Sequence, residues 1–138
     1  MLIPANRYHD CDAALSFITG VLGLEEHAVY RAEGGEIQHA QVKLGSGIMM
    51  FGPGSTASEF DRYLADPQEI GGRATTTIYA VIGSQEELET LYSRVTEAGA
   101  NILMPLAKQP YGGSNFTVAD PEGHIWSFGN YDPRRADD

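Results

Sequence analysis

The sequence predicts an α+β fold built from two similar modules, each with the element order βαβββ. Two segments have the apolar spacing of a helix, each lies between one extended segment and three others, and the closing strands of the two halves read alike. With 138 residues, 42% of them hydrophobic, the chain is long enough for one domain with its own core. We expect a single domain over residues 1–138, with module one at about 1–54, a connector at about 55–73 and module two at about 74–133.

The first helix is predicted over residues 10–23. Apolar side chains recur there at the spacing of one helical face. Either Asp10 or Asp12 can serve as the N-cap, because a short carboxylate accepts hydrogen bonds from the first free amides of a helix. Gly23 is expected to end this helix.

The second helix is predicted over residues 84–99 and has clearer boundaries. Ser84 and Glu87 have the spacing of a capping box, in which each side chain accepts a hydrogen bond from the other residue's amide. Gly99 is expected to end the helix in the left-handed conformation that glycine adopts without strain.

Extended segments flank both helices and are separated by glycine-rich turns. They are residues 2–8, 26–31, 37–44 and 48–51 in the first half, and residues 75–82, 101–105, 115–119 and 124–128 in the second. The connector is expected to hold a short helix around residues 58–65 that ends at Pro67. When the two closing strands are aligned on their Phe-Gly pairs, Met50 lies opposite Ser127.

The composition restricts the partners. The formal net charge is −10 and the sequence pI is about 4.7, so nucleic acid and anionic membrane surfaces would be repelled. No apolar run reaches the roughly 18–20 residues that cross a bilayer, and the first residues lack the layout of a signal peptide. Cys11 is the only cysteine, which excludes an internal disulfide and a cysteine-based zinc site. We therefore expect a cytoplasmic protein that binds neither nucleic acid nor membrane.

Three motifs resemble those of the vicinal oxygen chelate superfamily, the group of glyoxalases, bleomycin-resistance proteins and extradiol dioxygenases. They are residues 7–14 (RYHDCDAA) before the first helix, residues 21–24 (VLGL) at its end, and residues 120–124 (DPEGH) before the last strand. The resemblance implies that the two βαβββ modules form a curved, barrel-like mixed sheet around a cavity, with the helices outside. It also implies a homodimer.

Metal-using members of this superfamily take His, Gln or Glu ligands from the first and last strand of each module. The resemblance places these four positions at about Ile3, Met50, Thr77 and Ser127. One thioether and two hydroxyl groups do not replace the hydration shell of a divalent ion. We therefore expect no metal and no cofactor, which argues against the metal-dependent hemithioacetal isomerisation and ring cleavage of relatives.

The four histidines, His9, His27, His39 and His124, are scattered along the chain. None of them pairs with another at the i, i+4 spacing of a helical zinc motif. We interpret them as surface or rim residues, although a site that combines His39 with a carboxylate stays open.

Strand alternation predicts which side chains face the cavity. Trp126, Phe128, Met49 and Phe51 should pack on the helices, while their neighbours face inward. Arg7 is expected at the cavity mouth, and Tyr111 lies in the loop 109–114, which is either a lid or a simple loop anchor. The predicted ligand-binding residues are Arg7, Ile48, Met50, Thr77, Tyr79, Tyr111 and Ser127.

The leading hypothesis is a non-enzymatic binding protein of the bleomycin-resistance type. It would sequester a small organic compound without a metal, with cationic aromatic compounds as the first candidates. One alternative is a metal-dependent lyase, isomerase or dioxygenase with an atypical metal site. Another is a domain whose cavity has filled with side chains and that serves only in assembly.

Overall fold

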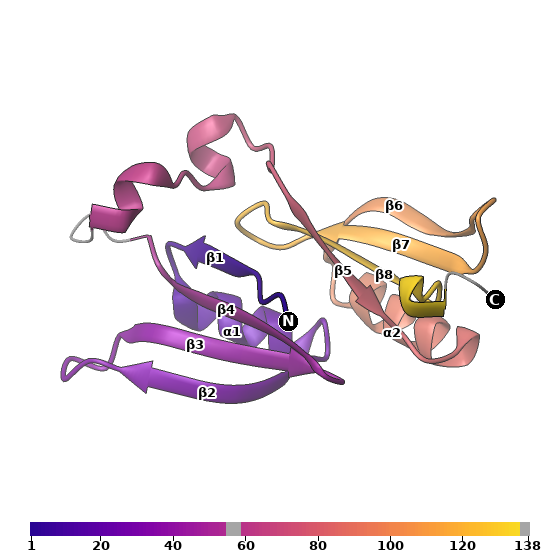
Figure 1. Ribbon diagram of the computed structural model, residues 1–138, viewed down its shortest axis with the longest axis horizontal. Helices are drawn as coiled ribbons and strands as arrows, with labels where there is room; N and C mark the ends of the chain where they lie inside the picture. Colours follow the sequence, from indigo (N-terminus) through magenta and orange to yellow (C-terminus); the bar gives the residue numbers. More distant parts are fainter. Residues whose placement is uncertain (55–58, 136–138) are drawn as a thin grey trace. The chain divides into compact units, whose positions relative to one another are not determined.

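In the computed structural model, which describes residues 1–54 and 59–135, the chain forms two compact units (Figure 1). Each unit contains one α-helix and one four-stranded mixed sheet. The element order therefore confirms two βαβββ modules and an α+β fold. The units are Met1–Thr75 with Pro121–Gly123, and Thr76–Asp120 with His124–Asp138.

In the first unit, the sheet order is β1-β4-β3-β2, in which β1 runs parallel to β4 and the other pairs are antiparallel. Two 3-10 helices, η1 and η2, follow β4. The elements are β1 (Ala5–Tyr8), α1 (Cys11–Gly20), β2 (Glu25–Arg31), β3 (Ile37–Leu44), β4 (Gly47–Pro53), η1 (Glu59–Tyr63) and η2 (Pro67–Ile70).

The second unit repeats this topology with the order β5-β8-β7-β6 and a parallel β5–β8 pair. The elements are β5 (Thr77–Val81), α2 (Gln85–Glu97), β6 (Asn101–Lys108), β7 (Ser114–Ala119), β8 (Ile125–Gly129) and η3 (Pro133–Arg135). Among the described residues, no strand of one sheet pairs with a strand of the other. The described residues therefore form two separate four-stranded sheets.

Both α-helices begin where capping residues were predicted. The side chain of Asp10 accepts a hydrogen bond from the Ala13 amide at 2.9 Å, which makes Asp10 the N-cap of α1. The Ser84 hydroxyl accepts one from the Glu87 amide at 3.1 Å at the start of α2. The side chains therefore satisfy amides that would otherwise have no partner within the helix.

The helix ends differ more from prediction. Gly99 has a φ of 76° just after α2, as expected for a left-handed stop. By contrast, α1 ends at Gly20, before the predicted Gly23, because the amides of Val21 and Leu22 both donate to the carbonyl of Phe17. Gly23 then takes a φ of 84° as the chain turns towards β2.

Proline positions account for the largest errors in the predicted boundaries. β6 continues past Pro105 to Lys108, because β6 is an edge strand, where a residue without an amide proton is tolerated. In the connector, Pro67 begins η2 instead of ending a helix. η1 covers Glu59–Tyr63, and the predicted helix start at Ser58 lies outside the described residues.

Each helix covers one face of its sheet with buried aromatic side chains, as the strand alternation predicted. In the first unit, Tyr8 meets Phe51 edge-on at 5.2 Å. In the second, Phe116 lies 5.0 Å from Tyr92 of α2 and stacks on Phe128 at 5.4 Å. These sheet residues are at most 2% exposed. In the part of the chain that the structure describes, no helix has the length and apolar character that crossing a membrane requires.

Candidate functional site

The face of the second sheet that points away from α2 carries a row of hydroxyl and amide groups. Ser127 of β8 lies between two of these groups. It pairs with Tyr79 of the parallel strand β5 and with Thr117 of the antiparallel strand β7. The hydroxyls of Thr117 and Ser127 are hydrogen-bonded at 2.7 Å. Neither is fully buried, so this pair can exchange its mutual bond for one to a ligand.

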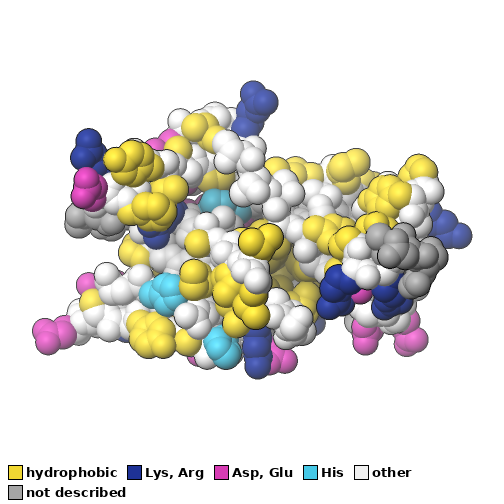
Figure 2. All heavy atoms as spheres, viewed as in Figure 1, with side chains coloured by type: hydrophobic (Ala, Val, Ile, Leu, Met, Phe, Trp, Pro, Cys, Tyr) yellow, Lys and Arg dark blue, Asp and Glu magenta, His cyan; other side chains and the backbone are white. Residues whose placement is uncertain are grey.

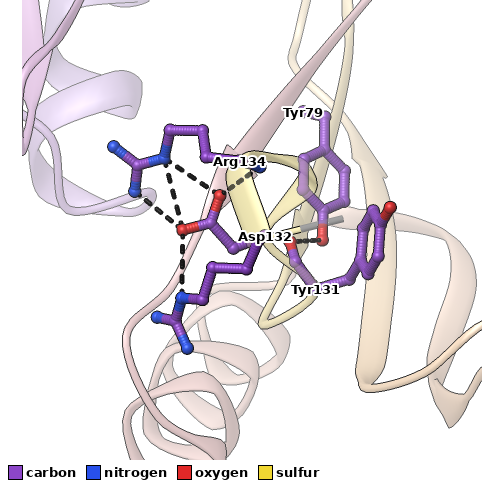
Figure 3. Close-up of polar contacts among 5 residues, drawn as sticks. Tyr79, Tyr131, Asp132 and Arg134 are labelled. Carbon is purple, nitrogen blue, oxygen red and sulfur yellow. Dashed lines mark hydrogen bonds and ion pairs between the residues drawn. The ribbon is translucent and has the colours of Figure 1, made fainter. Parts of the chain in front are cut away.

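Tyr79 lies on the edge strand β5, next to Ser127 of this row. Its hydroxyl donates a hydrogen bond to the carbonyl of Tyr131 at 2.8 Å (Figure 3). Partial burial and the neighbouring Tyr111 raise the pKa of Tyr79 above its ordinary value, so the phenol stays neutral. Gly129 makes room for this ring: a Cβ there would lie 2.5 Å from the Tyr79 hydroxyl oxygen.

Tyr111 is tied to the same face. Its hydroxyl accepts a hydrogen bond from the Asn115 side-chain amide at 2.8 Å, and its ring meets Tyr131 edge-on at 5.4 Å. The side-chain oxygen of Asn115 in turn accepts a hydrogen bond from the side-chain amide of Gln109 at 3.0 Å. Tyr111 therefore anchors its loop to the sheet while 58% of the residue remains exposed.

A charged cluster next to the tyrosines was not identified in the sequence. The carboxylate of Asp132 forms ion pairs with Arg134 at 2.8 Å and with Arg135 at 3.7 Å. Figure 3 shows the contacts between Asp132 and Arg134 beside the two tyrosines. Hydrogen bonds from Arg134 lower the pKa of Asp132 to about 2. The Asp132-Pro133 pair is a sequence signal for this cluster, because Asp-Pro begins a turn that brings the following residues back towards the carboxylate. No site was predicted in this C-terminal segment from the sequence.

In each sheet, we call the face that points away from its α-helix the open face. The open face of the first sheet has fewer hydroxyl groups than that of the second. Met50 lies beside Ala5 of β1 and Gln41 of β3, and Ile48 lies beside Lys43. The side chain of Gln41 contacts the imidazole of His39 at 3.1 Å. The predicted residues Ile48 and Met50 therefore sit on a face with a thioether, an aliphatic chain and one amide–imidazole pair.

Arg7 points away from its strand into the connector. Its Nε lies 3.0 Å from the carboxylate of Asp61, and its guanidinium carbon lies 5.6 Å from the centre of the Phe60 ring. Figure 2 shows hydrophobic side chains gathered at the surface of the connector, where Phe60 and Tyr63 are exposed. The charge of Arg7 is thus balanced within its own unit, which the sequence did not indicate.

The four positions implied for a metal do not offer suitable ligands. Ile3 precedes β1, and the residues that pair with Met50 and Ser127 in the parallel strand pairs are Ala5 and Tyr79. No imidazole or carboxylate is found at these positions, and a thioether, hydroxyls and a neutral phenol do not suit a divalent ion. The residues present at these positions therefore do not fit the family's metal.

A different group of potential ligands lies in the first unit. One ligand atom from each of His9, Asp66 and Glu69 lies within 4.8 Å of the others. The His9 imidazole contacts the Asp66 carboxylate, which also accepts from the Glu69 amide at 3.0 Å. Burial alone would raise the pKa of Asp66, but these contacts outweigh it and lower the pKa below its ordinary value.

Cys11 is buried at the start of α1. Burial, together with the negative charges of Glu122, Asp12 and Asp10, raises the pKa of the thiol to about 11. Since the thiolate is the reactive form, this environment suits an inert structural cysteine.

Comparison with known proteins agrees with the fold. The chain belongs to the glyoxalase/bleomycin resistance protein/dioxygenase superfamily, whose sequence profile matches residues 5–128. No curated protein sequence matches the chain.

Among solved structures, TioX from Micromonospora sp. ML1 is 27% identical, with a TM-score of 0.71 over 94% of each chain. A lactoylglutathione lyase from Agrobacterium tumefaciens is 21% identical, with a TM-score of 0.63 over 94% of this chain and 91% of that one. A glyoxalase-related enzyme from Fulvimarina pelagi is 20% identical, with a TM-score of 0.66 over 96% and 88%. At their lower identities, the last two support the fold alone.

Proposed function

We propose that this chain is a small-molecule-binding protein that holds a small organic compound on the open face of its second sheet, without a metal at the family's positions. Cationic aromatic compounds are the first candidates. The observation that carries the proposal is the group of neutral hydrogen-bonding and aromatic side chains gathered on that face. Its members are Tyr79, Tyr111, Asn115, Thr117, Ser127 and Tyr131.

The chemistry of this group favours recognition by stacking and hydrogen bonding. Tyr111 and Tyr131 offer ring surfaces that attract a cation or another aromatic ring. Thr117 and Ser127 supply hydroxyls that donate or accept as a ligand requires. The net charge of −10 adds a general attraction for cations. Of the other predicted ligand-binding residues, Thr77 lies two register pairs before Tyr79 on the same strand, whereas Arg7, Ile48 and Met50 belong to the first unit.

The test is a calorimetric titration with bleomycin-type and other cationic aromatic compounds, alongside neutral analogues of the same size. Tyr111→Ala should weaken binding roughly 10-fold, since a cation–π contact contributes about 0.5–2 kcal/mol. Tyr30→Ala is the matched control, because Tyr30 is an equally exposed tyrosine of the first sheet, at 59% against 58%. Absence of binding for every compound, or equal losses in the two variants, would overturn the proposal.

A metal-dependent lyase, isomerase or dioxygenase is the second candidate function. The observation that favours it is the group of potential ligands at His9, Asp66 and Glu69. It predicts turnover of hemithioacetal or catechol-type substrates only after nickel, zinc, iron or manganese is added. Lack of turnover with all four ions would remove it.

Two further expectations remain part of the proposal. A homodimer follows from the resemblance and is tested by light scattering at several concentrations. A cytoplasmic location agrees with a single buried, unpaired cysteine. If no ligand is found and the chain forms a stable assembly, the hypothesis of an assembly module replaces those of a binding protein and an enzyme.

A further inference from the structure

The end of β1 and the connector meet at three side chains with metal-binding chemistry. His9 directly follows β1, Asp66 caps η2 and Glu69 is the third residue of η2. One ligand atom from each lies within 4.8 Å of the other two. Donor atoms bound about 2 Å from one zinc ion are separated by distances within that range.

The types of donor select a class of ion. One imidazole nitrogen and two carboxylate oxygens suit borderline divalent ions such as Zn²⁺, Ni²⁺ or Mn²⁺. Hard ions such as Ca²⁺ prefer sites made of oxygen alone and take more ligands. The set carries two negative charges when the imidazole is neutral, which a divalent cation would balance.

The backbone at His9 and the side chain of Asp66 are already positioned. The backbone amides of His9 and Asp10 both donate to the carboxylate of Glu122, at 2.7 and 2.9 Å, which fixes the chain at His9. The Asp66 side chain is only 4% exposed and is oriented by the Glu69 amide at 3.0 Å. Glu69 itself is exposed, so its carboxylate can adjust to an ion. Positioned ligands lose less conformational freedom when they bind.

We propose that His9, Asp66 and Glu69 form a binding site for one divalent transition-metal ion that joins the connector to the end of β1. The site is distinct from Ile3, Met50, Thr77 and Ser127, where the family resemblance placed metal ligands. It is also independent of the proposed ligand face, because none of its three residues belongs to the second sheet. Either proposal can therefore fail while the other holds.

The experiment uses the full chain after treatment with a chelator and dialysis. Zn²⁺, Ni²⁺, Mn²⁺ and Ca²⁺ are titrated in turn by calorimetry, and thermal unfolding is recorded with and without each ion. We expect one equivalent of Zn²⁺ to bind and to raise the melting temperature, as any ligand specific for the folded state does. Ca²⁺ should bind much more weakly.

Variants assign the binding to these residues. His9→Gln and Glu69→Gln should each lower the Zn²⁺ affinity by more than about 10-fold, because even partners outside the ligand shell contribute about 10–100-fold. His27→Gln and Glu59→Gln are the matched controls, since both remove an exposed residue of the same type from the first unit. The controls should bind Zn²⁺ as the unmodified chain does.

Co²⁺ gives an independent readout of the ligands. Its visible absorption bands should appear with one equivalent and should be lost in His9→Gln. The proposal is overturned if no ion binds, if Ca²⁺ binds as tightly as Zn²⁺, or if the controls lose as much affinity as the ligand variants. It is also overturned if His9→Gln lowers the melting temperature without any effect of metal on either protein, since the cluster would then be only an ion pair.

Discussion

The two modules share a topology and a buried face, but their open faces have diverged. On the helix-covered faces, Phe51 of β4 and Phe128 of β8 occupy equivalent positions, and each contacts another buried aromatic ring, Tyr8 of β1 in the first unit and Phe116 of β7 in the second. On the open faces, the position occupied by Met50 in the first sheet is occupied by Ser127 in the second. The face that packs on the helix is constrained by volume and shape. The other face is free to vary, and a distinguishing function is best sought there.

The glycines at the ends of β4 and β8 illustrate the same contrast. Gly52 and Gly129 occupy equivalent register positions. A Cβ at Gly52 would lie 3.0 Å from the Gln38 carbonyl oxygen, whereas at Gly129 it would lie 2.5 Å from the Tyr79 hydroxyl oxygen and 2.9 Å from the Ser114 carbonyl oxygen. The glycine of the second module therefore makes room for the Tyr79 side chain.

The largest expected effect is a difference in stability between substitutions on the two faces of β8. Phe128→Ala should destabilise the protein by about 3–5 kcal/mol, because it empties a fully buried site between Phe116 and Trp126. Its neighbour Ser127→Ala should cost only about 1 kcal/mol, the net contribution of one hydrogen bond. Urea denaturation measures both. Similar losses for the two would mean that the open face is packed as tightly as the core.

The reactivity of the Cys11 thiol reports on the environment at the start of α1. The second module has no cysteine at the start of α2. Its pKa of about 11, against an ordinary value of 9.0, implies about 100-fold less thiolate at neutral pH. Reaction with a thiol reagent should therefore be at least about 100-fold slower in the folded chain than in denaturant. Equal rates in both states would show that the thiol is accessible and activated, and Cys11→Ser supplies the blank.

Alanine at the two equivalent glycines should distinguish the modules. Gly129→Ala is expected to cost about 1–3 kcal/mol through overpacking against Tyr79, Asn115 and the backbone. Gly52→Ala should cost less, because a contact of 3.0 Å is relieved by a small movement. Thermal unfolding measures both, and the reverse order would contradict the assigned close approach.

The smallest effect concerns acid stability at the end of the second module. Because the pKa of Asp132 is about 2 in the folded chain and 3.8 ordinarily, its ion pairs stabilise the fold above about pH 4. That contribution is lost as the pH falls through about 2. Arg134→Gln should raise the pKa of Asp132 and flatten this part of the stability curve, measured by urea denaturation at several pH values. An unchanged curve would mean that Arg135 alone holds the carboxylate.

Much of the fold was predictable because local signals determined it. The capping residues Asp10 and Ser84 and the left-handed Gly99 behave as their chemistry requires. The alternation that buries Trp126 and leaves Ser127 half-buried on the other face follows from the period of a strand. Errors arose at Pro67 and Pro105, where the sequence marks a break but does not tell whether an element begins there or lies at a sheet edge.

The candidate sites were less predictable. Tyr79 and Ser127 could be placed on one face, but the link from Tyr111 to Asn115 depends on how the loop folds back. Arg7 could be assigned a direction along its strand, but not its partner Asp61 in the connector. His9 is a third example. It lies far from Asp66 and Glu69 in the sequence, so no local spacing predicted that the fold would bring the three side chains together.

By itself, the sequence determined the repeat and the side chains that pack on each helix, because hydrophobic periodicity and capping act over a few residues. The family was indicated by the resemblance of three motifs and shown by the profile match. Only the tertiary structure decided which polar groups meet: Tyr111 and Asn115 in one unit, and the His9 imidazole and two carboxylates in the other. Such meetings join residues far apart in the chain. They depend on how strands and connectors pack, which no local pattern encodes.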